Sequence, residues 1–432
     1  MKKSIKYFPT ILWLLSFSFS IHLIADEQSS TPADYHYQGE LKVDPISGFI
    51  KASWQIDVLN LKISTVRFFL RNTLGHIEVS GSSILNKSIS QFKGMENFWA
   101  IDITLEKNVG AQHISISYDG ILIPEPMDNK INSIKADSIE LNVDSLWYPI
   151  DATFSKTLTV DLDIEIGKDW VGVSSGEFSK IDKGLNLTNH HAALNIPFAL
   201  SNSFMITKKY GFTVYDLRNT SKGLDELIAT ASFCKKYLDD LYGTKQKLPS
   251  ARLLLTTRQS SGYARNNYIV FTDVSNTKPI PQTKFVCHEM AHFWSSAGKF
   301  DTVDNWLNEA FAEYVGIMAV RKRYGESDYN KLISGYRKQI KGKELSAIWI
   351  AGETERKSYL VQYRKGPVAL FWLETTLGRE LFGKFIKHYM VNSIATTPEL
   401  ISALEEIAGS SVTERFVSIL GEYSSNGDKP RE

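Results

Sequence analysis

Two histidines and a glutamate in the second half of the chain have the spacing of metal ligands. His288 and His292 are four residues apart, so on one α-helix their imidazoles share a face and can bind one zinc ion at about 2.1 Å. Glu309, in the next helical stretch, is the natural third ligand. Three protein ligands leave one tetrahedral position open, which is typical of catalytic zinc sites. The pattern predicts one zinc ion per chain; the alternative is a solvated helix whose histidines pair with surface carboxylates.

Two further carboxylates accompany these candidate ligands. Glu289 follows His288 directly, where it is poorly placed to bind the metal but can act as a general base toward water. Glu313 lies four residues after Glu309 on the same helical face, and it could accept a hydrogen bond from the free nitrogen of a ligand histidine. An ordinary surface salt bridge is the alternative for Glu313. The three candidate ligands and Glu289 together are suited to metal-assisted hydrolysis.

Two neighbouring helices must bring these side chains together. Residues 283–296 are compatible with the first helix, and residues 303–323 predict a second one that returns beside it and places Glu309 within reach. Strand-like runs at 252–256 and 268–272 imply a small sheet that walls the cleft. Further helices are predicted at residues 222–242, 327–341, 364–390, 397–408 and 411–423.

The chain divides into a β-rich and a helical half. Short runs of alternating apolar and polar residues predict a β-rich N-terminal domain over residues 33–207, whereas helical periodicity dominates a second domain over residues 208–424. Residues 425–432 are polar and are expected to form a frayed tail. The predicted fold class is therefore multidomain α and β, with the mostly α-helical catalytic domain second.

The first 25 residues have the pattern of a secretory signal peptide. Three lysines precede an apolar run over residues 11–24, which is short for a membrane span and ends next to Ala25. Cleavage is expected after Ala25, with Ser20 as a second candidate. We expect a secreted or periplasmic protein with no membrane span after cleavage; an uncleaved membrane anchor is the alternative.

Composition excludes some partners and leaves the redox state open. The 49 basic and 48 acidic residues give a net charge of +1, which does not provide the basic surface that nucleic-acid binding needs. Cys234 and Cys287 are the only cysteines, so an oxidising compartment is permitted but not demanded. We expect Cys287 to serve helix packing rather than a bridge, because the sequence does not show that the two backbones approach each other. The oligomeric state is not indicated.

Three motifs together resemble the gluzincin family of alanyl aminopeptidases and leukotriene hydrolase. They are the zinc signature, the segment Gln362-Tyr363-Arg364-Lys365-Gly366 and the segment Trp147-Tyr148-Pro149-Ile150-Asp151. The resemblance runs from about residue 35 to 430, is strongest over 262–370, and does not include the family's additional C-terminal helical domain. It implies a β-rich N-terminal domain joined to a thermolysin-like catalytic domain. It also implies that the Tyr363 phenol hydrogen-bonds the oxyanion of the tetrahedral intermediate.

The chain departs from this family at two places. Family members have about 18 residues between the second histidine and the ligand glutamate, whereas this chain has 16. Where the family reads Gly-x-Met-Glu-Asn, this chain reads Gly262-Tyr263-Ala264-Arg265-Asn266. The family glutamate binds the free α-ammonium of the substrate, and Arg265 carries the opposite charge.

These departures change the expected substrate contacts. Arg265 and Gly262 are assigned to substrate binding by their place in the motif. Glu140, which lies near the position of a second amine-binding residue of the family, is a candidate substitute for the missing glutamate; the alternative for Glu140 is a surface strand carboxylate.

The sequence therefore predicts a secreted zinc metallopeptidase, an aminopeptidase with altered recognition of the substrate's N-terminal amine. A zinc peptidase or amidase that does not require a free N-terminus is the second hypothesis. A catalytically silent, zinc-stabilised binding protein is the third. The presence of Glu289 and Tyr363 argues against the third hypothesis, because neither residue is needed merely to hold zinc.

Overall fold

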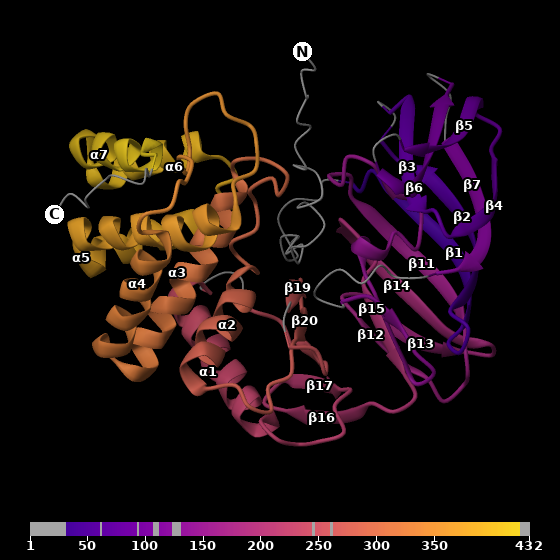
Figure 1. Ribbon diagram of the computed structural model, residues 1–432, viewed down its shortest axis with the longest axis horizontal. Coiled ribbons are helices and arrows are strands. Elements are labelled where there is room, and N and C mark those ends of the chain that lie inside the picture. Colours follow the sequence, from indigo (N-terminus) through magenta and orange to yellow (C-terminus); the bar gives the residue numbers. More distant parts are fainter. Residues whose placement is uncertain are drawn as a thin grey trace, which may run out of the picture.

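The computed structural model describes residues 32–423 except 61–62, 93–94, 107–111, 123–130, 244–246 and 260–261. The predicted signal peptide and the predicted frayed tail lie outside the described residues. Figure 1 shows two halves, one built of strands and coloured indigo to magenta, the other mostly helical and coloured from pink to yellow. The predicted fold class is confirmed.

The first half is organised around a seven-stranded sheet in the order β13-β14-β11-β1-β2-β7-β4. A four-stranded sheet has the order β10-β3-β6-β5, and another has the order β12-β15-β9-β8. The strands are β1 (Tyr35–Asp44), β2 (Phe49–Val58), β3 (Thr65–Arg71), β4 (Leu74–Ser80), β5 (Ile84–Phe92), β6 (Met95–Leu105), β7 (Gln112–Ile121), β8 (Ser133–Ile134), β9 (Ser138–Leu141), β10 (Ile150–Asp151), β11 (Leu158–Glu165), β12 (Val171–Ser174), β13 (Glu177–Ile181), β14 (Gly184–Ala193) and β15 (Phe198–Ser201).

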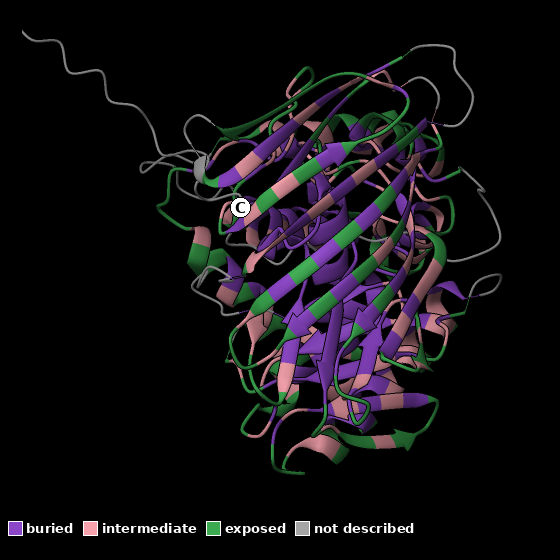
Figure 2. Cartoon of the chain, turned by 90° about the vertical axis from the view of Figure 1, so that its right-hand side faces the viewer, coloured by how far each residue is buried: buried purple, intermediate pink, exposed green. Residues whose placement is uncertain are grey.

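Alternating side chains explain why these segments form a half-buried sheet. In β2 every second residue is buried, among them Trp54 and Ile56, and the residues between them are exposed or partly exposed. Figure 2 shows this alternation as bands of purple, pink and green along the strands of the seven-stranded sheet. The inward faces share a core that includes Trp147 and Tyr148, so the segment before β10 is fixed by packing.

A five-stranded sheet in the order β16-β17-β18-β20-β19 leads into the second half. Its strands are β16 (Met205–Lys209), β17 (Phe212–Asp216), β18 (Arg252–Leu255), β19 (Tyr263–Arg265) and β20 (Tyr268–Phe271). The predicted runs at 252–256 and 268–272 correspond to β18 and β20. The prediction missed β19, which is three residues long and pairs antiparallel with β20. The predicted boundary between residues 207 and 208 falls within β16.

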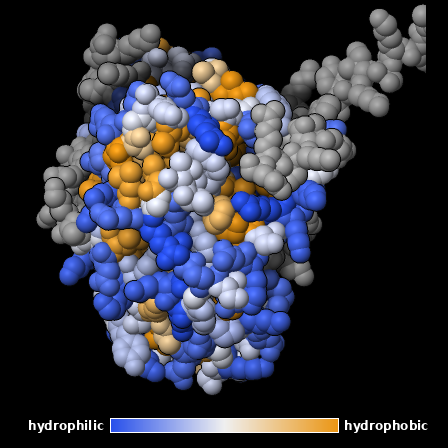
Figure 3. Space-filling view, turned by 90° about the vertical axis from the view of Figure 1, so that its left-hand side faces the viewer, coloured by the Kyte–Doolittle hydropathy of each residue, from blue (hydrophilic) through white to orange (hydrophobic). Residues whose placement is uncertain are grey.

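The described part of the chain has seven α-helices, the first between β17 and β18 and the others after β20, and their ranges agree with most of the predicted ones. They are α1 (Leu224–Tyr242), α2 (Pro279–Ala291), α3 (Asn305–Tyr324), α4 (Glu326–Ile340), α5 (Gly366–Val391), α6 (Thr397–Ala408) and α7 (Ser410–Gly421). Figure 3 shows an outer face of this helical half as mostly hydrophilic, with separate apolar areas. No described helix is long and apolar enough to cross a membrane.

The helix with the histidine pair begins and ends earlier than predicted. It starts with Pro279 in its first turn, where the missing amide hydrogen costs no hydrogen bond. It ends at Ala291 rather than at residue 296, and His292 is its C-terminal cap residue. The chain turns there because the backbone amides of residues 293–295 bond back to Met290 and Ala291, so the segment after His292 can fold against α3.

Cys234 and Cys287 form a disulfide, and the expectation of two unbridged cysteines was wrong. Cys234 lies in α1 and Cys287 in α2, with their Cα atoms 5.0 Å apart. Both side chains are fully buried where α1 packs along α2. The approach depends on this helix packing, which no local sequence pattern reveals.

Candidate metal centre and active site

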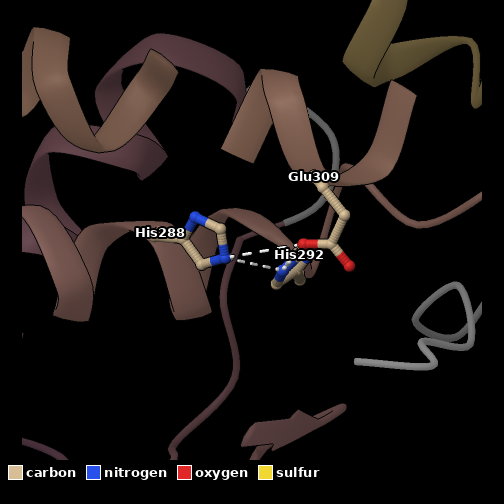
Figure 4. A group of neighbouring side chains, drawn as sticks. All are labelled: His288, His292 and Glu309. Atoms are coloured by element: carbon tan, nitrogen blue, oxygen red, sulfur yellow. Dashed lines mark hydrogen bonds and ion pairs between the residues drawn. The ribbon is translucent and has the colours of Figure 1, made fainter. Parts of the chain in front are cut away.

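Three potential ligand atoms converge at the C-terminal end of α2 and the first turns of α3 (Figure 4). The Nε2 atoms of His288 and His292 are 3.2 Å apart. The Oε2 atom of Glu309 lies 3.7 Å from the first nitrogen and 3.5 Å from the second. The three residues are buried. The structure therefore brings together all three ligands that the sequence predicts.

The dimensions and chemistry of this group fit a zinc ion. Ligand atoms about 2.1 Å from a tetrahedral metal lie about 3.4 Å from one another, and the three distances scatter around that value. The Oε2 atom of Glu309 is buried and has no hydrogen-bond partner among the described residues. An unpaired buried carboxylate oxygen is costly, and a bound cation would compensate for it. Two imidazoles and one carboxylate are a donor set that suits Zn²⁺.

Contacts behind the two imidazoles orient them toward this point. The Nδ1 atom of His292 is 3.1 Å from the carbonyl oxygen of Ser295, which orients the ring so that Nε2 faces the other two candidate ligands. The Nδ1 atom of His288 is 3.0 Å from Oε2 of Glu313, so the carboxylate lies directly behind the imidazole. Burial alone would lower the pKa of His288, but Glu313, with smaller contributions from Glu289 and Glu309, outweighs burial and raises it. Burial lowers the pKa of His292 to about 4.

Glu313 is the centre of a buried charge cluster that the sequence did not reveal in full. Its Oε1 atom accepts hydrogen bonds from Lys284 Nζ at 2.6 Å, from Arg364 Nη1 at 3.1 Å and from the Tyr336 hydroxyl. Burial would raise the pKa of Glu313, but Lys284, His288 and Arg364 hold it well below the ordinary value. Lys284 lies one helical turn before His288, a spacing that could have indicated its role.

Glu289 lies beside the ligand group without joining it. Its side chain is buried, and its Oε2 atom has no hydrogen-bond partner among the residues that the structure describes. Burial raises the pKa of Glu289 to about 7, against the lowering effect of the charges on His288 and Arg265. A carboxylate whose proton affinity is raised and whose oxygen is unengaged is suited to accept a proton from water.

Tyr363 reaches the same site from a different segment. It lies on a single π-helical turn, η3 (Val361–Lys365), immediately before α5. Its ring is stacked with His288, with centroids 5.8 Å apart. Burial, the charge of Glu309 and a hydrogen bond to that carboxylate raise the pKa of the Tyr363 phenol well above its ordinary value, so the phenol keeps its proton. Isolated π-helical turns are frequent at functional sites.

The predicted substrate-binding residues lie in different surroundings. Gly262 is buried directly before β19, and a side chain there would meet the Phe285 ring at 2.4 Å, so only glycine fits. Arg265 is at the end of β19, 5% exposed. Glu140, on β9, is engaged: it accepts hydrogen bonds from Arg258 and, at 3.2 Å, from the Tyr263 hydroxyl. The sequence did not indicate Arg258 as a partner, because it lies in the loop after β18, 118 positions from Glu140 along the chain.

Residues 262–418 match the sequence profile of the peptidase family M1 domain. The chain carries a peptidase family M1 domain. The metal-ligand group, Glu289 and Tyr363 all lie within the matched residues.

Relatives of the chain have aminopeptidase names. The chain is 28% identical over 204 residues to probable aminopeptidase 2 of Sulfurisphaera tokodaii, a match covering 41% of this chain and 26% of the relative. It is 31% identical over 150 residues to aminopeptidase M1 of Arabidopsis thaliana, covering 31% of this chain and 17% of the relative. The chain thus spans about a quarter or less of these relatives' lengths.

Solved structures share the fold over nearly the whole chain. An M1 zinc metallopeptidase from Deinococcus radiodurans superposes with a TM-score of 0.63 at 14% identity, over 90% of this chain and 93% of that one. Yeast LTA4 hydrolase in complex with bestatin gives a TM-score of 0.67 at 17% identity, over 94% of this chain and 72% of that one. The arrangement of a β-rich half before a mostly helical half is therefore shared with these proteins.

Proposed function

We propose that this protein is a zinc-dependent peptidase that binds one zinc ion through His288, His292 and Glu309. The observation that carries the proposal is the convergence of their three donor atoms at 3.2 to 3.7 Å, beside the unengaged carboxylate of Glu289. The matched family profile and the aminopeptidase relatives support the same reaction class.

Each side chain around the site has a separate role in peptide hydrolysis. When bound, the zinc ion would supply a Lewis acid that polarises the scissile carbonyl and lowers the pKa of water. Glu289 accepts the proton that the attacking water loses, and later delivers it to the leaving amine. The Tyr363 phenol, which keeps its proton, donates a hydrogen bond to the developing oxyanion. Glu313 holds the His288 ring in place from behind.

Recognition of the substrate's N-terminal amine is proposed to differ from that of the aminopeptidases which the sequence resembles. The carboxylate of Glu140 is already paired with Arg258 and Tyr263, which reduces its capacity for an ammonium group. Arg265 places a cation where those enzymes have a glutamate. These observations support an aminopeptidase-like enzyme that discriminates weakly against blocked N-termini.

An oxidising compartment is part of the proposal. The buried disulfide between Cys234 and Cys287 supports it, because such bridges are rare in reducing cytosol. The lysines and apolar run of the first 25 residues point in the same direction. We therefore propose that the protein is secreted or exported to the periplasm through a signal peptide, which is then cleaved.

A peptide-library assay tests this function. The mature protein, with and without a zinc chelator, is given matched peptides with free or acetylated N-termini. We expect hydrolysis that the chelator abolishes and that added zinc restores. We also expect peptides with free N-termini to be cleaved only slightly faster than their acetylated counterparts. Zinc binding without hydrolysis of any peptide would favour the silent binding protein, and a strict requirement for free N-termini would contradict the altered amine recognition.

A further inference from the structure

Arg265 is a buried cation with one edge of its guanidinium unused. The side chain is 5% exposed, and its Nη1 atom donates to the carbonyl oxygen of Ala264 at 2.7 Å. Its Nε and Nη2 atoms are buried and have no hydrogen-bond partner among the described residues. The guanidinium carbon lies 5.1 Å from the centre of the Tyr263 ring, which fixes the group by a cation–π contact.

The unused edge is the one that carboxylates occupy elsewhere in this structure. Arg67 donates from Nε and Nη2 to the two oxygens of Asp102, at 2.6 and 3.1 Å. Arg218 does the same with Asp216, at 2.9 and 2.8 Å. Two parallel N–H groups match the two oxygens of a carboxylate, and such paired contacts are among the stronger hydrogen bonds of proteins. At Arg265 the same pair of donors is present, but no acceptor within the described chain reaches it.

Arg265 lies on a strand that packs against the helix of the active site. β19, which ends at Arg265, contacts α2, the helix that carries His288 and Glu289. Asp144, on the short turn η2 (Val143–Ser145), interacts electrostatically with Arg265 from the β-rich half. Yet the buried Oδ1 atom of Asp144 has no hydrogen-bond partner among the described residues either. Asp144 and Arg265 therefore do not satisfy each other's hydrogen-bonding capacity.

We propose that Arg265 binds a carboxylate group of the substrate through Nε and Nη2. The inference rests on the proposed peptidase function and extends it to a substrate class, peptides that carry a carboxylate close to the bond that is cleaved. Two sources offer this group: the side chain of an acidic residue, or the terminal carboxylate of a short peptide. A buried guanidinium with two unsatisfied donors gains more from either one than from a neutral amide, because a carboxylate pairs both its charge and its hydrogen bonds.

Calorimetric titration of the zinc-loaded Glu289→Gln protein tests the inference without turnover. One arm compares the amidated tripeptides Glu-Ala-Ala and Ala-Glu-Ala with their glutamine counterparts. The other arm compares Ala-Ala-Ala as the free acid with its amide. We expect at least one carboxylate peptide to bind about tenfold or more tightly than its neutral match, and Arg265→Gln to abolish that difference. The arm in which the difference occurs identifies the source of the carboxylate.

Two further variants distinguish the charge of Arg265 from the geometry of its paired donors, and both from a general effect of losing an arginine on this sheet. Arg265→Lys should restore only part of the preference, because an ammonium group lacks the planar pair of donors. Arg252→Gln is the matched control on the same sheet: Arg252 donates to the backbone carbonyls of Ser174 and Gly176, and its loss should leave the preference unchanged.

Equal affinity for every carboxylate peptide and its neutral match would overturn the inference, and this comparison does not depend on whether Arg265→Gln folds. A preference that survives Arg265→Gln would overturn it as well. If the carboxylate preference depends on Arg265 but the wild-type protein hydrolyses no peptide, the proposed function fails while the binding role of Arg265 stands.

Discussion

The Oε2 atom of Glu313 lies 3.0 Å from the Nδ1 atom of His288. One turn of α3 therefore carries both the candidate metal ligand Glu309 and the carboxylate that contacts a second candidate ligand, His288. Glu309 faces the metal position and Glu313 faces the back of the imidazole. This arrangement ties the orientation of His288 to the same helix that supplies Glu309, and a shift of α3 against α2 would disturb two of the three ligands together.

Replacing Glu313 should weaken zinc binding without emptying the site. We expect Glu313→Ala to raise the dissociation constant for zinc by ~10 to 100-fold, because His288 loses its orienting carboxylate but keeps its ligand atom. Competition with a chromophoric chelator measures this constant. Glu380→Ala, at an exposed position of α5, is the control and should leave it unchanged. If Glu313→Ala removed the metal entirely while Glu309→Ala retained it, the ligand assignment would be wrong.

Tyr363 should contribute to the transition state more than to substrate binding. Tyr363→Phe is expected to lower kcat by an amount equivalent to ~2 to 4 kcal/mol, with little change in KM, because the hydroxyl donates to an oxyanion that exists only during the reaction. Steady-state kinetics and zinc content are measured together, since the phenol also contacts Glu309. Tyr359→Phe, whose ring stacks on Tyr363 at 4.7 Å, is the matched control. A rise in KM at constant kcat would argue against the oxyanion role.

The disulfide should stabilise the helix that carries the histidines. Replacing both cysteines by alanine is expected to lower the free energy of unfolding by ~2 to 5 kcal/mol, because the bridge joins residues 53 positions apart and restricts the unfolded chain. Urea unfolding of oxidised, reduced and doubly substituted protein measures the difference. Reduction should destabilise the wild type and leave the double variant unaffected. Identical unfolding curves for oxidised and reduced wild-type protein would exclude this role.

A buried carboxylate away from the metal group should make stability depend on pH. Burial would raise the pKa of Glu374, but hydrogen bonds from Arg321, Tyr314 and Tyr329 outweigh burial and lower it below the ordinary 4.5. A lowered pKa contributes stability that is complete above the ordinary pKa and is lost as pH falls through the folded-state pKa. We therefore expect Glu374→Gln to cost about 1 to 3 kcal/mol at pH 7 and progressively less below pH 4.5. Urea unfolding midpoints of the wild type and Glu374→Gln across this pH range measure the difference in stability. A difference that increases on acidification would contradict the role assigned to Glu374.

Local sequence patterns predicted the helices and strands of this fold better than the contacts between them. The alternation in β2 and the helical spacing around His288 and Glu309 are read from neighbouring residues, and the structure contains the corresponding strand and helices. The early end of α2 was not predicted, because it depends on how the segment after His292 packs on α3. Likewise, β19 has only three residues, too few to show a period of two.

Long-range pairings account for the remaining differences. The bridge of Cys234 with Cys287 and the pairing of Glu140 with Arg258 join residues 53 and 118 positions apart. Neither partner carries a sequence signal for the other, since each contact depends on the packing of separate elements. The charged cluster around Glu313 is of the same kind, because Lys284 comes from α2 and Arg364 from the turn before α5.

Zinc content and turnover of Glu289→Gln, measured on the same preparation, test the central claim most directly. The amide removes the proton acceptor but no metal ligand, so we expect zinc to remain near one ion per chain while kcat falls by ~10² to 10⁴-fold or more. Unchanged turnover in Glu289→Gln, or a wild-type protein that binds no zinc, would contradict the account.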